Sequence, residues 1–377
     1  MKFKADRATL LKSLAHIQSV AEKRNTIPIL ANARLEVKDG KLSFTATDME
    51  IAIVEEVATV EAAEDGATTA PAATLYEIVR KLPEGAEVEL HQSGGDSPLA
   101  LRAGRYATSL VTLPVEDFPS MTAGALPHRF KLLANTLRGL IDRTRFAIST
   151  EETRYYLNGI YLHTAEGDGG RVLRAVATDG HRLARVEEPE PEGAGEMPGV
   201  IVPRKTVGEL RKLLEEETGE IDIGLSDTRI QFKVGAVQLT SKLIDGTFPE
   251  YERVIPKDND KVLRVGNQEF SAAVSRVAAI STERSRPVKL TLARDLLTLS
   301  AASPEQGTAT EELNDGQVQY QASPLEIGFQ ARYLNDITDQ IAKDKAVEFC
   351  FADGAAPTIV RDAEDASALY VLMPMRV

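Results

Sequence analysis

The sequence predicts an α+β fold made of three copies of one domain, in which two helices pack against antiparallel strands. The first observation is an internal repeat. Asp48 and Asp179 share an Ala-Thr-Asp context 131 positions apart, and a fainter copy follows 124 positions later at Ser303. The second is a verbatim repeat, Ala147-Ile-Ser-Thr-Glu151 and Ala279-Ile-Ser-Thr-Glu283. A period this long indicates a small domain rather than a solenoid unit of roughly 20–50 residues.

Turn-forming residues cluster at two places, Gly124–Pro127 and Lys257–Asp260. We therefore expect domains at residues 1–126, 127–258 and 259–377, which suits a chain of 377 residues. Features that differ between the copies should carry the specialised function.

The first domain opens with apolar residues at helical spacing, from Leu10 to Ile17. This helix ends before Pro28, because the residue that precedes a proline avoids helical geometry. Alternating strands follow, the first two joined by the hairpin signal Asp39-Gly40. A second helix begins after Pro71. The strands that we expect are 34–37, 41–45, 50–54, 87–90, 99–101 and 107–113.

The second domain restarts at Phe130, and its second helix begins at Pro203. The Pro- and Gly-rich stretch 187–199 is typical of a mobile surface loop. The apolar stripe of the second domain's first helix is Leu133, Leu137, Leu140 and Ile141. The strands of the second domain are 159–163, 171–177, 220–225, 230–234 and 237–243.

The third domain starts near Leu263. In the third domain a helix carries Leu334, Ile337 and Ile341, and a strand follows at 347–351.

Charge is distributed unevenly along the chain. The net charge is −13, which argues against a protein that binds nucleic acid over its whole surface. Lys and Arg nevertheless gather on all the expected helices, and the acidic residues gather in loops and strands. An ordinary solvated helix face is the alternative for any single helix. The pattern predicts a basic helical layer that contacts phosphates without reading bases.

The single cysteine, Cys350, lies between Phe349 and Phe351 and is expected to be a buried core thiol. An N-terminus without an apolar central run indicates no signal peptide, and no stretch is long and apolar enough to span a membrane. These features together favour the cytoplasm.

Asp179 and His181 could form a catalytic base and its orienting group, with Thr178 or Ser241 as the nucleophile. The upstream copy keeps Asp48 but has Met and Glu in place of Gly and His, so the aspartate is better explained as a turn residue. The five histidines are scattered without ligand spacing. We therefore expect no enzyme activity, no metal and no cofactor.

The C-terminal segment is apolar, which is unusual for a chain end. Leu369–Val371 suits a final core strand, but Met373-Pro374-Met375 cannot extend a ladder well, because proline lacks the backbone donor. Adaptable Met side chains at a surface edge favour a groove that accepts short peptides.

Several motifs closely resemble the bacterial sliding-clamp family, the beta subunits of the replicative DNA polymerase III, and the resemblance covers the whole chain. They are Thr26–Leu30, Arg154–Gly159, Ala177–Ala184, Val202–Lys205, Asp245–Pro249 and Met373–Arg376. The resemblance implies a head-to-tail homodimer that closes three domains per chain into a six-domain ring around duplex DNA. Its implied role is a processivity factor, with a clamp loader, the replicative polymerase and other clamp-binding proteins as partners.

The resemblance also implies particular site residues. Arg24, Arg204 and Lys205 are the DNA-contact candidates, and the subunit interface joins strands near Leu110 and Ile280. The peptide pocket would comprise Leu157, Thr178, Gly180, His181, Arg182, Leu183, Pro249, Arg253, Val254, Val371, Met373, Pro374, Met375 and Arg376. A hydrolase-like enzyme that uses Asp179 and His181, or a purely structural repeat protein, are the alternatives.

Overall fold

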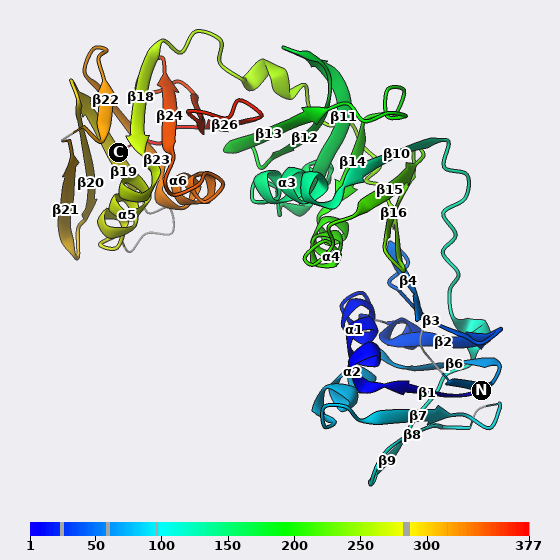
Figure 1. The fold of residues 1–377 in the computed structure, drawn as a ribbon. Coiled ribbons are helices and arrows are strands. Elements are labelled where there is room, and N and C mark those ends of the chain that lie inside the picture. The colour runs from blue at the N-terminus through cyan, green and yellow to red at the C-terminus, as the bar shows by residue number, and fades with distance from the viewer. Residues whose placement is uncertain (23–25, 58–60, 96, 282–286, 315, 377) are drawn as a thin grey trace. The chain divides into compact units, whose positions relative to one another are not determined.

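The computed structural model describes residues 1–377 except 23–25, 58–60, 96, 282–286, 315 and 377 (Figure 1). The chain divides into two compact units. Unit 1 comprises residues 1–138 and 191–244, and unit 2 comprises residues 139–190 and 245–377. Both units combine helices with antiparallel sheets, so the α+β prediction is confirmed. None of the described helices is long and apolar enough to cross a membrane.

Unit 1 contains two antiparallel sheets, with strand orders β5-β1-β7-β8-β9 and β10-β15-β16-β17-β4-β3-β2-β6. The strands of the first sheet are β1 (Lys2–Asp6), β5 (Glu61–Glu64), β7 (Glu87–His91), β8 (Leu99–Ala103) and β9 (Tyr106–Leu110). Those of the second are β2 (Asn32–Lys38), β3 (Lys41–Thr47), β4 (Ile51–Val57), β6 (Gly66–Pro71), β10 (His128–Leu133), β15 (Glu220–Leu225), β16 (Arg229–Val234) and β17 (Val237–Lys242). β14 (Val200–Pro203) leads into α4.

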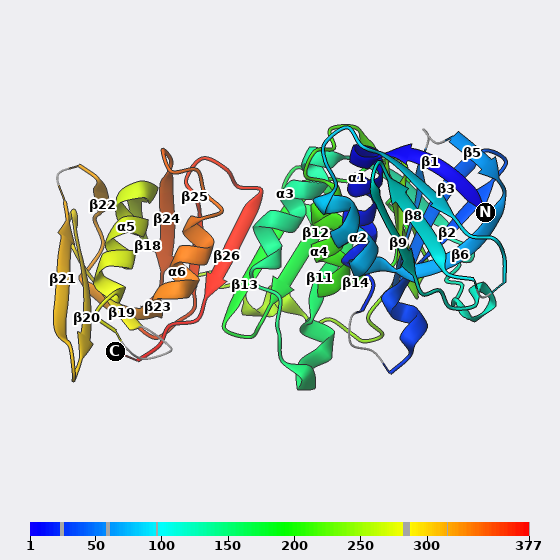
Figure 2. The same ribbon diagram turned by 90° about the horizontal axis from the view of Figure 1, so that it is seen from below.

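The helices of unit 1 are α1 (Arg7–Gln18), α2 (Ala72–Lys81) and α4 (Arg204–Leu213), with short η1 (Pro28–Ala31) and η2 (Val115–Asp117). α1 begins where the Asp6 carboxylate accepts from the Thr9 backbone N–H at 2.9 Å, a typical helix cap. It lies beside α2 in both views (Figures 1 and 2) and packs against β3 and β4. Its buried side chains include Leu10, Leu14 and Ile17, as the periodicity predicts.

Unit 2 also contains two antiparallel sheets. Eight strands follow the order β11-β12-β13-β26-β25-β24-β18-β22, and four follow β21-β20-β19-β23. They are β11 (Gly159–Gly167), β12 (Gly170–Thr178), β13 (Arg182–Pro189), β18 (Lys261–Gly266), β19 (Pro287–Ala293), β20 (Leu296–Ser303), β21 (Gly307–Leu313), β22 (Val318–Tyr320), β23 (Leu325–Gln330), β24 (Ala346–Phe351), β25 (Thr358–Asp362) and β26 (Ala368–Leu372).

Helices α5 (Asn267–Ala278) and α6 (Ala331–Thr338) pack together in unit 2, and α5 also lies against β20 and β21. Two short helices, η3 (Glu152–Leu157) and η4 (Tyr251–Val254), also belong to this unit. α3 (Ala134–Arg145) contributes its residues from 139 onward to unit 2.

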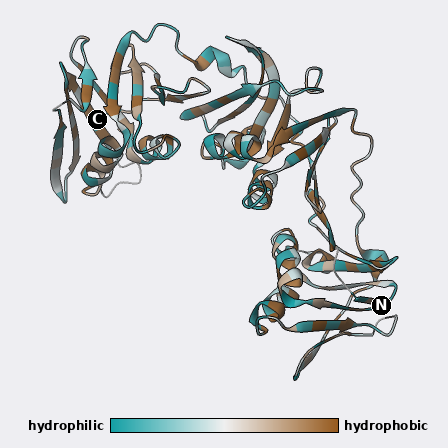
Figure 3. Cartoon of the chain, viewed as in Figure 1, coloured by the Kyte–Doolittle hydropathy of each residue, from teal (hydrophilic) through white to brown (hydrophobic). Residues whose placement is uncertain are grey.

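Hydrophilic and hydrophobic segments interleave along the strands (Figure 3). This alternation follows from the two-residue period of a strand that has one face toward the core. Cys350 is 7% exposed in β24, which confirms the expectation of a buried thiol. The Asp39-Gly40 turn joins β2 to β3 with positive φ at both residues, as the hairpin signal predicts.

The structure corrects two of the sequence-based expectations. Leu133 does not belong to the buried stripe of α3, because it ends β10 and is 55% exposed. The stretch 187–199 is not a loop throughout: β13 continues to Pro189, and Ala194 and Met197 are buried. The strands that were not predicted from the sequence are β1, β5, β6, β10, β13, β14, β18, β19, β20, β21, β22, β23 and β25.

The loop of residues 190–199 makes a close approach to β10 at Gly193. This glycine has a φ of 91°, and a Cβ placed on it would collide with the Arg129 carbonyl oxygen. Both conditions require glycine.

We predict that Gly193→Ala lowers the free energy of unfolding by about 1–3 kcal/mol, because a residue with a Cβ is strained at this φ and must displace β10. Urea unfolding monitored by circular dichroism measures the change. Gly169→Ala is the matched control, because its Cβ would enter open space. Equal stabilities of the two variants would contradict the close approach.

Candidate functional site

The turn between β12 and β13 is built by Thr178 and Asp179. The Thr178 hydroxyl donates to the Arg182 carbonyl oxygen at 2.7 Å and accepts from the Gly180 N–H at 3.1 Å. Asp179 Oδ1 accepts from the backbone N–H groups of His181 at 2.9 Å and Arg182 at 3.0 Å. Gly180 takes a φ of 88°, a conformation that glycine adopts at low cost. The turn is thus fixed by its own side chains.

The upstream copy in unit 1 repeats this hydrogen-bond pattern. The Thr47 hydroxyl donates to the Ile51 carbonyl oxygen and accepts from the Met49 N–H, and Asp48 Oδ1 accepts from the N–H groups of Glu50 and Ile51. Met49 has a φ of 75°, in the place of Gly180. The prediction that both aspartates are turn residues is confirmed.

The turn is joined to the C-terminal tail by backbone hydrogen bonds. β13 pairs with β26, with Leu183 opposite Val371, and the Met373 N–H donates to the His181 carbonyl oxygen at 2.9 Å. The strand ends at Leu372, and the Met375 N–H then donates to the Gly328 carbonyl oxygen at 2.9 Å. The structure therefore brings the predicted residues of the turn and the tail together, and the proline interrupts the ladder as expected.

The second group of predicted residues, Pro249, Arg253 and Val254, lies on or beside η4. Their segment is anchored on β11 and β12 through Phe248 and Tyr251, whose rings pack with Tyr161 and His163 from β11. Leu157 ends η3 and is buried. These residues all belong to unit 2, where Pro249, Arg253 and Val254 are exposed.

Exposure divides the predicted pocket residues into a floor and a rim. Leu157, Leu183 and Val371 are at most 3% exposed and can only support the surface. The accessible residues are Gly180, His181, Pro249, Arg253, Val254, Met373 and Arg376, with Thr178, Pro374 and Met375 half-buried. Large apolar groups at a rim, such as Val254 and Met373, are features of peptide-binding surfaces.

Arg182 is a structural residue of this site and has little surface to offer a partner. Its side chain is 4% exposed, and the guanidinium donates to Asp179 Oδ2 at 3.1 Å, to Asp336 and to the Phe146 carbonyl oxygen at 2.6 Å. It also lies between two rings, 5.1 Å from the centroid of Phe146 and 4.4 Å from that of Tyr333. Burial raises the pKa of the Tyr333 hydroxyl.

Sequence reasoning missed Phe146, Tyr333 and Asp336, which hold this guanidinium. Only the spacing of Tyr333 and Asp336, three residues apart on one helix face, could have hinted that they act together. Nothing in the sequence links them to a turn about 150 positions upstream.

The DNA-contact candidates differ in their surroundings. Arg24 lies outside the described residues. Arg204 is exposed at the first position of α4. Lys205 is bonded to Asp48 and lies 3.5 Å from Glu22. Burial lowers the pKa of the Lys205 ammonium, but the hydrogen bond to Asp48 and the two carboxylate charges outweigh this and raise the pKa overall.

The basic bias of the helices is real but uneven. The six α-helices carry thirteen Lys or Arg residues and five Asp or Glu residues, against a net charge of −13 for the chain. The surplus belongs to α1, α2, α3 and α4, whereas α5 and α6 are each balanced. The expectation that all six helices are biased alike is wrong. Many helical cations are also paired, such as Arg276 with Glu311 at 2.5 Å.

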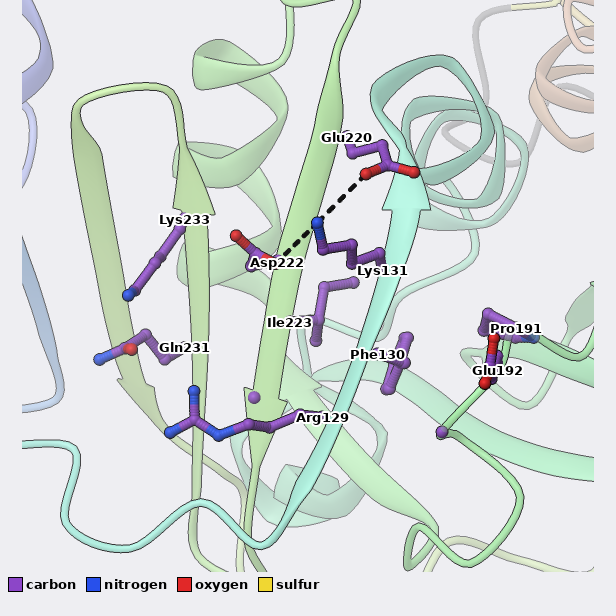
Figure 4. Close-up of a pocket in the computed structure, with 12 residues that line it drawn as sticks. Arg129, Phe130, Lys131, Pro191, Glu192, Glu220, Asp222, Ile223, Gln231 and Lys233 are labelled. Carbon is purple, nitrogen blue, oxygen red and sulfur yellow. Dashed lines mark hydrogen bonds and ion pairs between the residues drawn. The ribbon is translucent and has the colours of Figure 1, made fainter.

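A hollow of about 830 Å³ lies on the outward face of the β10-β15-β16 sheet, beside residues 191–193 (Figure 4). Its charges compensate one another across the strands. Lys131 lies 3.2 Å from Glu220 and 3.7 Å from Asp222, and Lys233 is the cross-strand neighbour of Asp222. This arrangement explains the hollow as a solvated face with cross-strand ion pairs.

Three family models match the chain in order. Residues 1–122 match the N-terminal domain of the DNA polymerase III beta subunit, residues 131–250 its central domain, and residues 252–376 its C-terminal domain. The beta sliding clamp of Caulobacter vibrioides is 53% identical over 378 residues, and that of Escherichia coli is 40% identical over 377 residues. Each alignment covers 100% of both chains.

Solved structures of such clamps also match along the whole chain. The Caulobacter crescentus beta sliding clamp gives a TM-score of 0.96 at 53% identity, covering 100% of this chain and 99% of that one. A DnaN sliding clamp from Bartonella birtlesii bound to griselimycin gives 0.95 at 48% identity, covering 100% of both chains.

We predict that Arg182→Ala lowers the unfolding free energy of unit 2 by about 2–4 kcal/mol, because it leaves two carboxylates without their shared cation. Differential scanning calorimetry of the full chain measures this loss. Arg253→Ala is the control, since its side chain is 79% exposed and its removal should change stability by less than about 0.5 kcal/mol. A similar small effect of Arg182→Ala would refute its structural role.

Proposed function

The chain belongs to the DNA polymerase III beta-subunit family, the beta sliding clamps, and we propose that it is a ring-shaped processivity factor. As a homodimer it encircles duplex DNA, slides on it, and tethers the replicative polymerase and other partners. The observation that carries this proposal is the match to beta sliding clamps over the entire chain in both sequence and structure. The setting is the bacterial cytoplasm.

The two copies join head to tail through strand edges. β9 is the last strand of its sheet in unit 1, and β21 is the last strand of its sheet in unit 2. Leu110 at the end of β9 is buried within its own chain, and Tyr106 and Val111 beside it are 44% and 74% exposed. Ile280, just after α5, is half-buried. Pairing β9 of one copy with β21 of the other would satisfy both edges, and two such heterologous contacts close a ring.

Contacts with DNA are electrostatic and independent of sequence. The surplus of Lys and Arg on α1, α2, α3 and α4 suits the DNA phosphate backbone. The net negative charge of the whole chain limits non-specific attraction of DNA to the rest of the protein surface. Arg204 supplies a direct phosphate contact, together with Arg24. Lys205 stays charged but first bridges α4 to the Asp48 turn.

Partners are tethered through the surface that the turn, the tail and η4 form. Short peptides with large apolar side chains pack against the exposed Met373 and Val254. Griselimycin, which is bound to the Bartonella birtlesii relative, is expected to occupy this same surface.

The C-terminal tail provides a direct test of the pocket. Removing the chain from Met373 onward should weaken binding of a fluorescein-labelled polymerase-derived peptide at least about tenfold, because central apolar anchors dominate such interfaces. Fluorescence anisotropy measures the affinity, and gel filtration should show an unchanged dimer. Normal peptide affinity in the truncated protein would show that the pocket lies elsewhere.

The DNA-facing surface is tested by reversing one charge. Arg204→Glu should weaken binding to a short duplex and reduce the slope of log affinity against log salt by about 1, the loss of one phosphate contact. Lys257→Glu, in an exposed loop outside the helices, is the matched control and should leave the slope unchanged. An identical slope for both variants would place the DNA surface away from α4.

A further inference from the structure

The short helix η4, which we place at one side of the proposed peptide pocket, is held by a polar and aromatic cluster. Tyr161 and His163 project from the same face of β11, because alternate residues of a strand share a face. The Tyr161 ring stacks on His163 at 4.6 Å and on Phe248 at 4.8 Å between centroids. Tyr251, the first residue of η4, packs beside His163 at 5.7 Å. The cluster therefore connects a strand of the sheet directly to η4.

The hydrogen bonds of the cluster have a fixed direction. His163 Nδ1 lies 3.0 Å from the Thr164 carbonyl oxygen, which can only accept, so Nδ1 carries the proton of a neutral ring. Nε2 is then an acceptor, and the Tyr251 hydroxyl, 3.0 Å away, must donate to it. Arg174 Nη1 donates to the oxygen of that hydroxyl at 3.3 Å. The chain runs from Arg174 through Tyr251 to His163.

Charged groups from each neighbouring element surround His163. Arg174, its cross-strand partner on β12, is bound to Glu187 of β13 at 2.6 Å and to Glu252 of η4 at 2.5 Å. Arg185 of β13 also lies 3.2 Å from Glu187. Burial, followed by the positive charge of Arg174, lowers the pKa of His163 below its ordinary value, although Thr164, Glu252 and Glu187 oppose this.

Fixing Tyr251 fixes the exposed end of η4. The Tyr251 N–H donates to the Pro249 carbonyl oxygen at 2.7 Å, and the Arg253 N–H donates to the Glu250 carbonyl oxygen at 3.1 Å. Val254 ends this single turn and is 52% exposed. A helix of four residues has little stability of its own, so its position depends on these anchors.

We propose that the Arg174–Tyr251–His163 hydrogen-bond chain positions η4 as the second wall of the peptide pocket, and that protonation of His163 releases this wall. The proposal rests on the proposed function, because it assumes that η4 lines the pocket. It assigns a role in partner binding to three residues that need not touch the peptide.

Protonation breaks the chain at a defined point. A protonated His163 presents an Nε2–H to the Tyr251 hydroxyl, so the hydroxyl proton loses its acceptor. The protonated ring also places a positive charge beside Arg174. Glu252 and Glu187 already accept from Arg174 and offset this only in part. The pKa of His163 is lowered while the Arg174–Tyr251–His163 hydrogen bonds are intact. The ordered position of η4 is therefore favoured above about pH 6.5 and is lost as the pH falls below it.

The test measures griselimycin affinity by isothermal titration calorimetry on the full chain between pH 7.5 and 5.5. The affinity of the unmodified protein should fall by up to about tenfold over this range. The reason is that protonation of His163 lowers the fraction of molecules in which η4 is ordered for binding. Tyr251→Phe, which removes only the hydroxyl, should lose about threefold to tenfold in affinity at pH 7.5, the worth of one hydrogen bond. His163→Gln retains an acceptor and does not titrate, so it should bind nearly normally at pH 7.5 and lose less affinity at pH 5.5.

The comparison with His163→Gln isolates the effect of His163, because the exposed His181 is present in both proteins. Parallel pH profiles for the unmodified protein and His163→Gln would overturn the proposal, as would unchanged affinity in Tyr251→Phe. Failure of the unmodified protein to bind griselimycin at pH 7.5 would instead refute the pocket itself. Thermal denaturation of each variant checks that the fold persists.

Discussion

The buried guanidinium of Arg182 determines where the turn between β12 and β13 lies in unit 2. Desolvating a charge is costly, and the cost is offset here because two carboxylates, a carbonyl oxygen and two aromatic faces surround it. These groups come from the turn itself, from the segment after α3 and from α6. Because each of them has one position in which it satisfies the cation, the turn, the tail that pairs with it and α6 are fixed together. The rim that we propose as the partner-binding surface depends on this interior.

The two turns that share one hydrogen-bond pattern show how a repeated domain acquires a specialised role. Thr and Asp build the same backbone path at residues 47–51 and 178–182. In the first copy the turn is held from outside, since Asp48 binds Lys205 of α4. In the second copy the cation is Arg182 of the turn itself, which binds both Asp179 of the turn and Asp336 of α6. At Gly180 the Arg154 guanidinium packs where a Cβ would otherwise be, whereas Met49 in the first turn is 45% exposed.

Much of the fold could be predicted from the sequence, because helical stripes such as Leu10 to Ile17 and the Asp39-Gly40 hairpin are local signals. β1 alternates polar and apolar residues but is only five residues long, and β5 has no alternation. Both strands are defined by pairing with distant residues, as Phe3 is with Leu90. Leu133 fits both a helical stripe and a strand end, and only the register of β10 decides between them. The turn followed from the internal repeat and the tail from its apolar composition, and the residue set of the pocket followed from the resemblance. The partners of Arg182 and the cluster around His163 did not, because they depend on tertiary contacts.

Topology, rather than affinity, holds the proposed ring on DNA, and this is tested by comparing retention on circular and linear DNA. The protein is placed on a nicked plasmid by a clamp loader, separated from free protein, and the plasmid is then cut once with a restriction enzyme. A ring held by topology stays on the circle and leaves the linear molecule through its ends. Equal retention on the linear DNA would contradict the account and indicate ordinary affinity for the duplex.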